Sequence, residues 1–359
     1  MLRIALIQRF LPSRSRGGVG HFAHGLAETL VRRGHHVTMF SEDPLPAGAS
    51  YSHRLVPARG GVLAPLVFPW SLRACDFTGF DVIHAQGDEQ WISHRAAPVV
   101  RTMHGTGLAE AWFNGVRGRS LKRTGMFLWF YLMEVIADSR ADAVAVISAG
   151  TSAFYPKTTA VVPNGIDAAR FADARARVHK STAPSILFVG QLHSRKRGAW
   201  LVDVFRRDVR SRVSNAELWL VSPDSVDVPA DSGVVHLGAL SDEALADKLA
   251  EAWIMCLPSA YEGFGRPYAE AMAAGAVAAS TPNAGANDVL DGGNAGLLAD
   301  DNVLGASLAA LLVDASARQR FIEAGAARVR QYEWDVVAAQ YESLYARVID
   351  ARARAQRRA

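Results

Sequence analysis

Residues 253–275, WIMCLPSAYEGFGRPYAEAMAAG, read as a strand, a glycine turn and a helix in immediate succession. The apolar run 253–259 predicts the strand, Gly263 and Gly265 predict the turn, and the helix is expected to begin near Pro267. Free backbone N–H groups and the positive end of such a helix can meet an anion. The stretch therefore predicts a ligand site at the carboxyl end of a strand.

Two carboxylates flank this turn. Glu262 lies in the loop and Glu270 lies one turn inside the helix, so both can face one ligand, yet they are too far apart to share a proton. Carboxylates suit sugar and ribose hydroxyls because each accepts two hydrogen bonds from a vicinal diol. The alternative is that Glu270 is an exposed acid of the first helical turn and that Gly263 and Gly265 merely form the turn. Neither glutamate alone would favour a ligand site, but the whole string does.

Apolar runs of strand length continue on both sides of this stretch and alternate with helical segments. That pattern predicts parallel sheets covered on both faces by helices. The runs are RIALIQ (3–8), VTMFS (37–41), DVIHAQ (81–86), VVRTMH (99–104), AVAVIS (143–148), TAVVPN (159–164), SILFVG (185–190), AELWLVS (216–222), GVVHLG (233–238), WIMCLPS (253–259), AVAAST (276–281) and AGLLAD (295–300).

The series breaks once, which indicates two domains. We expect an α/β fold of two doubly wound, Rossmann-like domains facing across a cleft, where open α/β sheets bind ligands. Residues 1–167 form the first domain and 185–335 the second. Residues 168–184 are polar, rich in Ala and Arg and without a strand, so we expect a linker. Residues 336–359 form a last helix with a basic tail.

Composition and charge set further limits. The chain has 359 residues, 50% hydrophobic and 21% charged, which excludes a disordered or fibrous protein. The net charge of +4 is unevenly distributed: residues 1–167 carry 17 basic and 12 acidic groups, residues 168–350 carry 18 and 23, and residues 351–359 hold four arginines. We expect the tail to join the basic first domain and this polarity to face an anionic acceptor or membrane.

Cysteine usage and apolar runs predict the compartment. Cys75 and Cys256 lie far apart in apolar surroundings, which favours reduced, buried thiols over a disulfide or a metal site. The opening residues read as a strand rather than a signal peptide, and no apolar run reaches the roughly 20 residues of a membrane span. We therefore expect a cytoplasmic protein whose membrane contacts are peripheral.

The chain resembles the retaining GT-B glycosyltransferases of family 4, whose E-x7-E signature corresponds to Glu262 and Glu270. The resemblance covers nearly the whole chain and implies that the last helix crosses back to the first domain. It rests on the following segments: Gly17-Gly18-Val19, DVIHAQ (81–86), Thr102-Met-His104, ADAVAVIS (141–148), VVPNGID (161–167), FVGQLHSRK (188–196), HLGALSDEAL (236–245) and Tyr332-Glu-Trp334.

The resemblance also implies roles for residues of the second domain. Glu270 would hold the ribose of a nucleotide and Glu262 the donor sugar, while backbone N–H groups of Gly263, Phe264 and Gly265 would take sugar and phosphate oxygens.

A basic pair neutralises the leaving diphosphate in the family, and its positions here are Gln191 and Lys196. Gln191 departs from the family, which usually has Arg, and a neutral amide does not supply that charge. Arg195 or Arg197 is the expected substitute; a solvated helix start is the alternative for these cations.

Three further positions belong to the first domain. By resemblance His104 lies near the donor sugar, where it would stabilise positive charge on the anomeric carbon. A packed, hydrogen-bonded histidine is the alternative, and His84 fits that interpretation better. Gly17 and Gly18 would let the backbone approach phosphate or acceptor, or would simply form a turn.

The reaction that the resemblance implies is glycosyl transfer with retention, in which the acceptor hydroxyl attacks from the face that the diphosphate leaves. We expect a nucleotide-diphosphate sugar as donor, no cofactor and no metal, since Asp300-Asp301 is only a pair of adjacent acids in a connection. Ser222-Pro223 replaces a glycine usual in the family beside the base pocket, so the base stays open. The acceptor carries a hydroxyl, and a lipid-linked or surface-glycan precursor is one compatible class.

Residues 112–123, WFNGVRGRSLKR, form a cationic segment with no acid, followed by GMFLWFYLM. Such a pairing suits a peripheral enzyme approaching anionic lipid, to which each cation contributes ~1 kcal/mol. We expect the apolar part, with Phe127, Phe130 and Tyr131, to pack into the first domain, and the cations Arg117, Arg119, Lys122 and Arg123 to form a surface patch. Nucleic acid is disfavoured because aromatic residues do not interleave with the basic ones.

Two other functions remain open. Gly18-Val-Gly20-His-Phe-Ala23 matches a dinucleotide-binding pattern, with Glu42 or Asp43 as the ribose-binding acid of an NAD-dependent oxidoreductase. Roughly ten residues separate its strand from the glycines, whereas that fingerprint needs an immediate turn. A sugar-nucleotide epimerase or a non-catalytic sugar-nucleotide binder of the GT-B fold is the second alternative.

Overall fold

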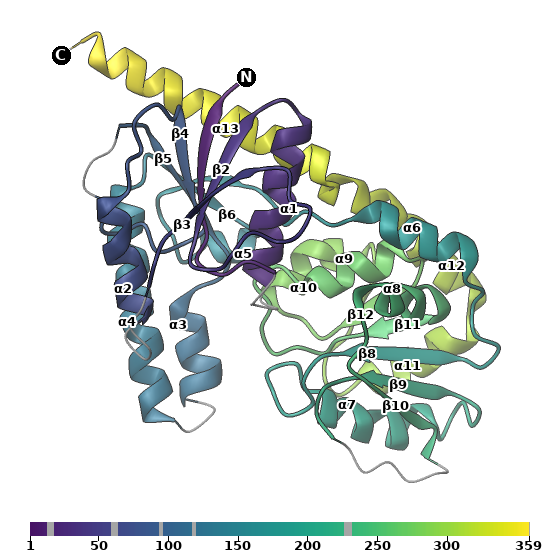
Figure 1. Cartoon of the computed structure of the whole chain (residues 1–359). Coiled ribbons are helices and arrows are strands. Elements are labelled where there is room, and N and C mark those ends of the chain that lie inside the picture. Colours follow the sequence, from purple (N-terminus) through teal and green to yellow (C-terminus); the bar gives the residue numbers. More distant parts are fainter. Residues whose placement is uncertain (13–17, 59–63, 93–95, 117–119, 226–231, 359) are drawn as a thin grey trace. The chain divides into compact units, whose positions relative to one another are not determined.

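The computed structural model describes residues 1–12, 18–58, 64–92, 96–116, 120–225 and 232–358 (Figure 1). The chain divides into two compact units. Unit 1 comprises Met1–Gly165 together with Trp334–Ala359, and unit 2 comprises Ile166–Glu333.

Unit 1 contains a parallel sheet of seven strands in the order β3-β2-β1-β4-β5-β6-β7. All the strands predicted before residue 168 are present. The edge strand β3 was not predicted because its sequence, SHRL, is mostly exposed and has no apolar pattern. The strands are β1 (Arg3–Ile7), β2 (His36–Ser41), β3 (Ser52–Leu55), β4 (Val82–Ala85), β5 (Val99–Met103), β6 (Ala143–Val146) and β7 (Thr158–Val161).

Alternate side chains of the central strands enter two separate cores, one on each face of this sheet. Ile4 and Leu6 of β1 enter the core shared with helices α1 and α13, whereas Ala5 and Ile7 enter the core on the opposite face. Each fully buried large apolar side chain contributes about 1.5–3 kcal/mol. The helical segments of unit 1 are α1 (Gly18–Arg32), α2 (Ala64–Ser71), η2 (Leu72–Ala74), α3 (Gly107–Glu110), η3 (Ala111–Val116), α4 (Leu121–Arg140), α5 (Ala149–Ser152) and α13 (Trp334–Gln356).

Helix α13 is separated from the rest of unit 1 in the sequence but packs on it along α1 (Figure 1). A Cβ at Gly25 or at Gly165 would lie within 2.3 Å of the Trp334 ring, so both glycines leave space for that indole. Arg33, which directly follows α1, forms two hydrogen bonds with Glu342, at 2.7 and 2.8 Å. The last helix is thus an integral part of unit 1.

Unit 2 contains a second parallel sheet, of six strands in the order β10-β9-β8-β11-β12-β13. Every strand predicted after residue 184 is present, although the last is only two residues long. The two doubly wound sheets confirm the predicted fold class. The strands are β8 (Ser185–Val189), β9 (Glu217–Val221), β10 (Val234–Gly238), β11 (Ile254–Cys256), β12 (Val277–Ser280) and β13 (Leu297–Leu298).

The segment 168–184 differs from the expected linker because it contains helix α6, which packs against α8 within unit 2. Phe171 and Ala174, three residues apart, form its buried face, and such a short apolar stripe is inconspicuous among polar residues. The helical segments of unit 2 are α6 (Ala168–Arg177), α7 (Gly198–Val204), η4 (Phe205–Val209), α8 (Asp242–Glu251), α9 (Arg266–Ala273), α10 (Ala284–Val289), η6 (Asp291–Gly293), α11 (Leu304–Val313), α12 (Ala315–Val329) and η7 (Arg330–Tyr332).

The apolar segment of helix α4 was expected to pack into the core of the first domain, and this expectation is wrong. Phe127, Phe130 and Tyr131 are only half-buried, and the outward face of the helix is itself apolar. Gly107 allows α3 to approach α4 closely, since a Cβ there would lie 2.7 Å from the Phe127 carbonyl oxygen. Figure 1 shows the pair extending away from the strands of unit 1. In α3, η3 and α4, nine large apolar side chains are exposed: Leu108, Trp112, Val116, Leu121, Met126, Leu128, Trp129, Leu132 and Val135.

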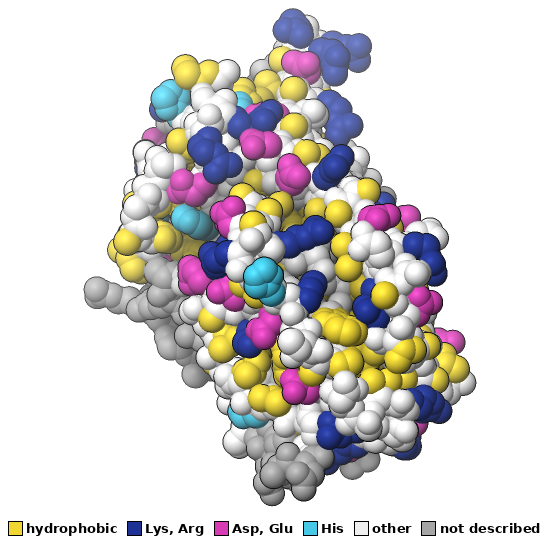
Figure 2. Space-filling model, turned by 90° about the vertical axis from the view of Figure 1, so that its right-hand side faces the viewer, with side chains coloured by type: hydrophobic (Ala, Val, Ile, Leu, Met, Phe, Trp, Pro, Cys, Tyr) yellow, Lys and Arg dark blue, Asp and Glu magenta, His cyan; other side chains and the backbone are white. Residues whose placement is uncertain are grey.

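The basic tail comprises the last turn of α13 and the residues that follow it: Arg354 lies in the helix, Arg357 and Arg358 follow its end, and all three are exposed. Figure 2 shows Lys and Arg side chains gathered at that end of the molecule. In Figure 1 this end and the first turn of α4 lie at opposite ends of unit 1, so the tail and the cations Lys122 and Arg123 form two separate basic regions. Arg117 and Arg119 lie outside the described residues. Within the described part of the chain, no helix is long and apolar enough to cross a membrane.

Candidate active site

The side chain of Lys196 lies against the end of strand β8. The strand ends at Val189, and Gly190 follows with a φ of +143°, a conformation that favours glycine. A Cβ at Gly190 would lie 2.3 Å from Cδ of Lys196, so the missing side chain leaves space for the lysine stem. Nζ of Lys196 donates a hydrogen bond to the Val189 carbonyl oxygen at 3.3 Å.

Lys196 lies within electrostatic reach of both predicted carboxylates. Burial lowers the pKa of its ammonium group, the negative charges of Glu262 and Glu270 raise it, and the charge of Arg195 lowers it further. Unit 2 therefore brings together one partly desolvated cation and two acids that lie 66 and 74 residues further along the chain.

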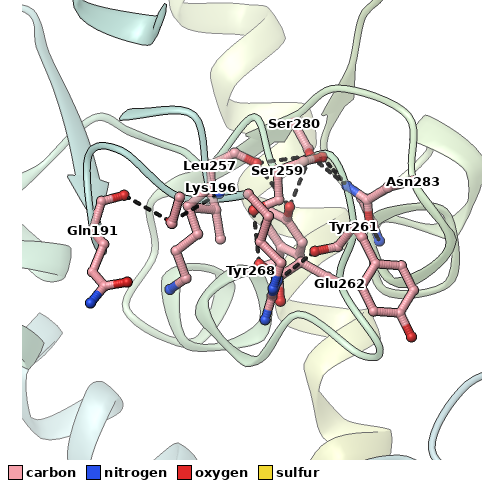
Figure 3. A network of polar contacts seen from close by, with 12 residues as sticks. Gln191, Lys196, Leu257, Ser259, Tyr261, Glu262, Tyr268, Ser280 and Asn283 are labelled. Carbon is pink, nitrogen blue, oxygen red and sulfur yellow. Dashed lines mark hydrogen bonds and ion pairs between the residues drawn. The ribbon is translucent and has the colours of Figure 1, made fainter. Parts of the chain in front are cut away.

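Glu262 is buried and held in place through one of its oxygens. Its Oε1 accepts a hydrogen bond from Oγ of Ser259 at 2.8 Å (Figure 3). The same Oε1 lies 2.9 Å from Nη1 of Arg195. Among the described residues both contacts are made to Oε1, so Oε2 is left to accept hydrogen bonds from a ligand. Arg195 is thus the cation that the structure places at this carboxylate.

The glycine turn between the two acids has the expected form. Gly265 adopts a φ of +87° directly before α9, and a Cβ there would lie 2.4 Å from Cδ2 of Tyr268, so a side chain is excluded twice over. Phe264 is buried edge-to-face on Tyr332, with ring centroids 5.2 Å apart, and Gly263 is half-buried. The turn therefore offers backbone N–H groups at the start of a helix.

Glu270 lies on α9, one turn beyond the start of that helix. Its carboxylate is largely buried, and Oε1 accepts a hydrogen bond at 2.9 Å from Nη2 of Arg266, which lies four residues earlier on the same helix. The pair orients Glu270 beside the glycine turn.

A buried polar network lies beneath this turn and was not predicted from the sequence. Asn283 caps α10 by accepting from the Ala286 N–H at 3.0 Å, and its amide donates to the Ser259 carbonyl oxygen at 3.0 Å. The hydroxyl of Tyr268 donates to the Leu257 carbonyl oxygen at 2.8 Å (Figure 3). Polar residues at the ends of neighbouring apolar strands were the signal that would have revealed these residues.

The cations next to Gln191 have different environments. Gln191 is exposed, and its carbonyl oxygen accepts from Oγ of Ser194. Arg197 forms two hydrogen bonds with Asp301, at 2.7 and 2.9 Å, and stacks on Trp200. Arg197 is thus paired with an acid outside the predicted site, whereas Arg195 contacts the predicted carboxylate Glu262, which favours Arg195 as the additional cation of the site.

His104 follows strand β5 in unit 1 and contacts the rim of its core. Its Nε2 lies 2.7 Å from Oε1 of Gln86, and its ring packs edge-to-face on Phe22. Burial and the positive charge of Arg101 lower the pKa of His104 to about 3, so its imidazole is neutral near pH 7. His84 is completely buried and contacts hydrogen-bond partners through both ring nitrogens, as expected of a packed histidine.

The glycines of the first loop give a mixed result. Gly17 lies outside the described residues. Gly18 is the first residue of α1 and has open space where a Cβ would be. Gly20 is packed, because a Cβ there would lie 2.6 Å from the Phe10 carbonyl oxygen.

The acids that a dinucleotide would need are occupied by the protein itself. Glu42 pairs with Arg9 at 2.8 Å, and the buried Asp43 accepts a hydrogen bond from the Leu11 N–H at 3.0 Å. This environment does not favour the oxidoreductase alternative. In the part of the chain that the structure describes, no cluster of three or more His, Cys, Asp or Glu residues could hold a metal ion.

Comparisons with known proteins cover both units. A model of the family described as Glycosyltransferase Family 4 matches residues 16–170, and a model described as Glycosyl transferases group 1 matches residues 183–315. The chain belongs to glycosyltransferase family 4. As a glycosyltransferase it uses a sugar donor and an acceptor, and the oxidoreductase alternative falls.

Two relatives of this glycosyltransferase are mycobacterial. It is 27% identical to an MMP alpha-(1->4)-mannosyltransferase of Mycolicibacterium hassiacum, over 97% of this chain and 98% of the relative. It is 32% identical to a phosphatidyl-myo-inositol mannosyltransferase of Mycobacterium tuberculosis, over 54% of this chain and 56% of the relative.

A solved structure shares the whole fold of the glycosyltransferase. The sucrose-phosphate synthase of Thermosynechococcus elongatus superposes with a TM-score of 0.79 at 22% identity, over 98% of this chain and all of that one. This likeness supports the GT-B fold.

Proposed function

We propose that this glycosyltransferase moves a sugar from a nucleotide-diphosphate sugar to a hydroxyl acceptor with retention at the anomeric carbon. The observation that supports this most is the constellation in unit 2, where Glu262 and Glu270 flank a glycine turn within electrostatic reach of the partly desolvated Lys196. One cation, two diol-binding carboxylates and free N–H groups match the parts of a sugar diphosphate.

Each part of the donor has a proposed partner. Glu270 binds the ribose hydroxyls, and Glu262 binds the sugar through Oε2. Lys196 and the N–H groups of Gly263, Phe264 and Gly265 take the diphosphate and sugar oxygens. Arg195 replaces the cation missing at Gln191 indirectly, because its contact with Glu262 keeps positive charge at the site.

The proposed reaction needs no nucleophile from the enzyme. The bond from the anomeric carbon to the diphosphate oxygen breaks and its electron pair stays on that oxygen, where the positive charge of Lys196 stabilises it. The acceptor oxygen forms its bond on the same face, and its proton passes to the departing diphosphate. We propose that His104 stabilises positive charge on the sugar ring and that the backbone at Gly18 contacts phosphate or acceptor; Gly17, predicted for the same role, lies outside the described residues. We infer no metal and no cofactor.

The acceptor and location are proposed from unit 1. Both relatives above are named as mannosyltransferases, and one is named for phosphatidyl-myo-inositol, so a mannose-bearing donor and a lipid-linked acceptor are the first to test. Unit 1 carries 22 Lys and Arg residues against 14 Asp and Glu, whereas unit 2 carries 17 against 21. We propose a cytoplasmic location at the inner face of the cell membrane.

The surface that would contact the membrane is the outward face of α4. Leu121, Leu128, Leu132 and Val135 recur at helical spacing and are all exposed, Leu121 by 92%. Exposed Lys122 begins the same helix. An apolar stripe beside cations on a basic unit is complementary to an anionic lipid surface.

The decisive experiment combines donor binding with transfer. Thermal shifts are measured with UDP-, GDP-, ADP- and dTDP-sugars and with NAD(H), and transfer is then assayed with the stabilising donor. Glu262→Ala and Lys196→Ala should abolish transfer with the fold intact, whereas Lys248→Ala, whose lysine pairs with Glu251 elsewhere in unit 2, should behave as the wild type. Near-normal turnover in both site variants would refute the proposal. Donor binding without transfer to any acceptor would favour a non-catalytic binder, and interconversion of the donor would favour an epimerase.

A further inference from the structure

A chain of hydrogen bonds runs from His104 into the core of unit 1. Nε2 of His104 lies 2.7 Å from Oε1 of Gln86, an oxygen that only accepts. The proton of the His104 imidazole therefore lies on Nε2, and Nδ1 keeps a lone pair for a ligand hydroxyl. Gln86 is itself buried, so its amide has little freedom to turn.

The other end of the Gln86 amide fixes the direction of this chain. Its Nε2, which only donates, lies 3.1 Å from Nε2 of His84. His84 Nε2 is therefore an acceptor, and the proton of this second imidazole lies on Nδ1.

Two tyrosines of helix α13 complete this chain of hydrogen bonds. Oη of Tyr345 lies 2.7 Å from Nδ1 of His84 and accepts a hydrogen bond from its N–H, while Oη of Tyr341 lies 2.9 Å from Oγ1 of Thr102. Oγ1 of Thr102 lies 2.8 Å from Nε2 of His84, so its hydroxyl and the Gln86 amide share the lone pair of that nitrogen. Tyr341, Tyr345 and His84 have no exposed surface, so this inner part of the network exchanges no partner with water.

We propose that Gln86 is a positioning residue that sets the tautomer and orientation of His104, and that Tyr341 and Tyr345 of the C-terminal helix hold Gln86 in place through His84. The proposal rests on the function proposed above, because it takes His104 to face the donor sugar. Under this proposal helix α13 not only buries apolar surface but also helps to orient His104.

The test reads the tautomers directly, without substrate. The protein is labelled with 15N-histidine, and the long-range couplings of each ring to its carbon-bound protons separate the two tautomers; His104→Asn and His84→Asn assign the signals. The wild type should show His104 protonated on Nε2 and His84 protonated on Nδ1. Gln86→Leu should leave His104 in a mixture, and Tyr345→Phe should move His84 toward the Nε2 tautomer.

Tyr51→Phe is the matched control, because the hydroxyl of Tyr51 makes a similar contact with Nδ1 of His24 at 2.8 Å elsewhere in unit 1. It should leave His104 unchanged. Gln86→Leu should lower kcat about tenfold with little change in the KM for the donor, since a misoriented group weakens the transition state more than binding.

His104 protonated on Nδ1 in the wild type, or an unchanged His104 signal in Gln86→Leu, would overturn the inference. A normal tautomer pattern in a protein with no transferase activity would refute the proposed function instead. Unchanged kcat in Gln86→Leu with altered tautomers would show that the network is structural only.

Discussion

The stem of Lys196 occupies the space that a side chain at Gly190 would need, since a Cβ on that glycine would lie only 2.3 Å from Cδ of the lysine. Lys196 can therefore lie against the end of strand β8 because the residue that follows this strand, Gly190, has no side chain. The positive φ of Gly190 adds a second reason for glycine at this position.

Gly190→Ala should consequently displace Lys196 and lower transfer about a hundredfold, because a misplacement near 1 Å costs on that order. Circular dichroism should show a retained fold. Gly125→Ala is the control: Gly125 lies in α4 with open space around it, so alanine there should raise helix stability by about 0.5–1 kcal/mol and leave transfer unchanged. Equal activity of the two variants would contradict the role of the glycine.

Asn283 couples the stability of unit 2 to the site. Asn283→Ala removes the cap of α10 and the hydrogen bond to the Ser259 carbonyl oxygen, so it should cost about 1–2 kcal/mol of unfolding free energy and weaken donor binding. Ser241→Ala removes a comparable cap from α8, at the Ala244 N–H. It should cost about 1 kcal/mol and leave donor binding unchanged, as urea unfolding and calorimetry would measure. Similar donor affinities in the two variants would show that the Asn283 cap does not contribute to donor binding.

The stability of the protein should depend on pH through His84. Burial lowers the pKa of this imidazole from 6.5 to about 3. Between these values the unfolded chain binds a proton that the folded chain does not, so the free energy of unfolding falls as the pH falls, by about 1.4 kcal/mol per pH unit. His84→Gln removes that titration, and its free energy of unfolding should depend less steeply on pH between 6.5 and about 4. Parallel slopes for the two proteins in urea titrations would count against a neutral, buried His84.

The apolar face of α4 should hold the protein on anionic vesicles. Leu128→Glu combined with Leu132→Glu places two charges in the exposed stripe and should reduce flotation with phosphatidylglycerol-containing vesicles at least tenfold, while neutral vesicles bind little of either protein. Leu55→Glu with Val161→Glu changes two exposed apolar side chains elsewhere in unit 1 and should bind like the wild type. Loss of vesicle binding in this control pair would show a general effect of charge. If the wild type does not bind vesicles but forms dimers in a concentration-dependent way, the apolar face of α4 would instead be an interface with a second copy of the chain.

Strands were the part of the fold that could be predicted most fully. The central strands of a parallel sheet are buried on both faces, so they stand out as continuous apolar runs. Strand β3 and helix α6 were missed because most of their residues face water, and the few buried positions in α6 do not dominate its composition. For helix α4 the opposite error was made: its apolar residues were predicted to be buried, because the sequence alone does not distinguish an exposed apolar face from a buried one.

In the site, local patterns were readable and distant pairings were not. Glu262, the glycine turn and Glu270 lie within nine residues, and backbone geometry alone relates them. The contact between His84 and Tyr345 joins residues 261 positions apart, and nothing in either neighbourhood indicates the other. Gln86 ends a buried strand, but its importance depends on which side chains it contacts in three dimensions.

The order in which the chain is synthesised adds a consequence to the position of α13. Unit 2 is one continuous segment, whereas unit 1 begins with the first residue and is completed only by Trp334–Ala359. While the ribosome is making unit 2, the nascent sheet of unit 1 lacks one of its core-covering helices and both tyrosines that contact the His84–Thr102 pair. Domains generally fold in the order of their synthesis. Here the unit that is started first is completed only after unit 2, so a chain interrupted before Trp334 lacks the helix whose tyrosines contact His84 and Thr102.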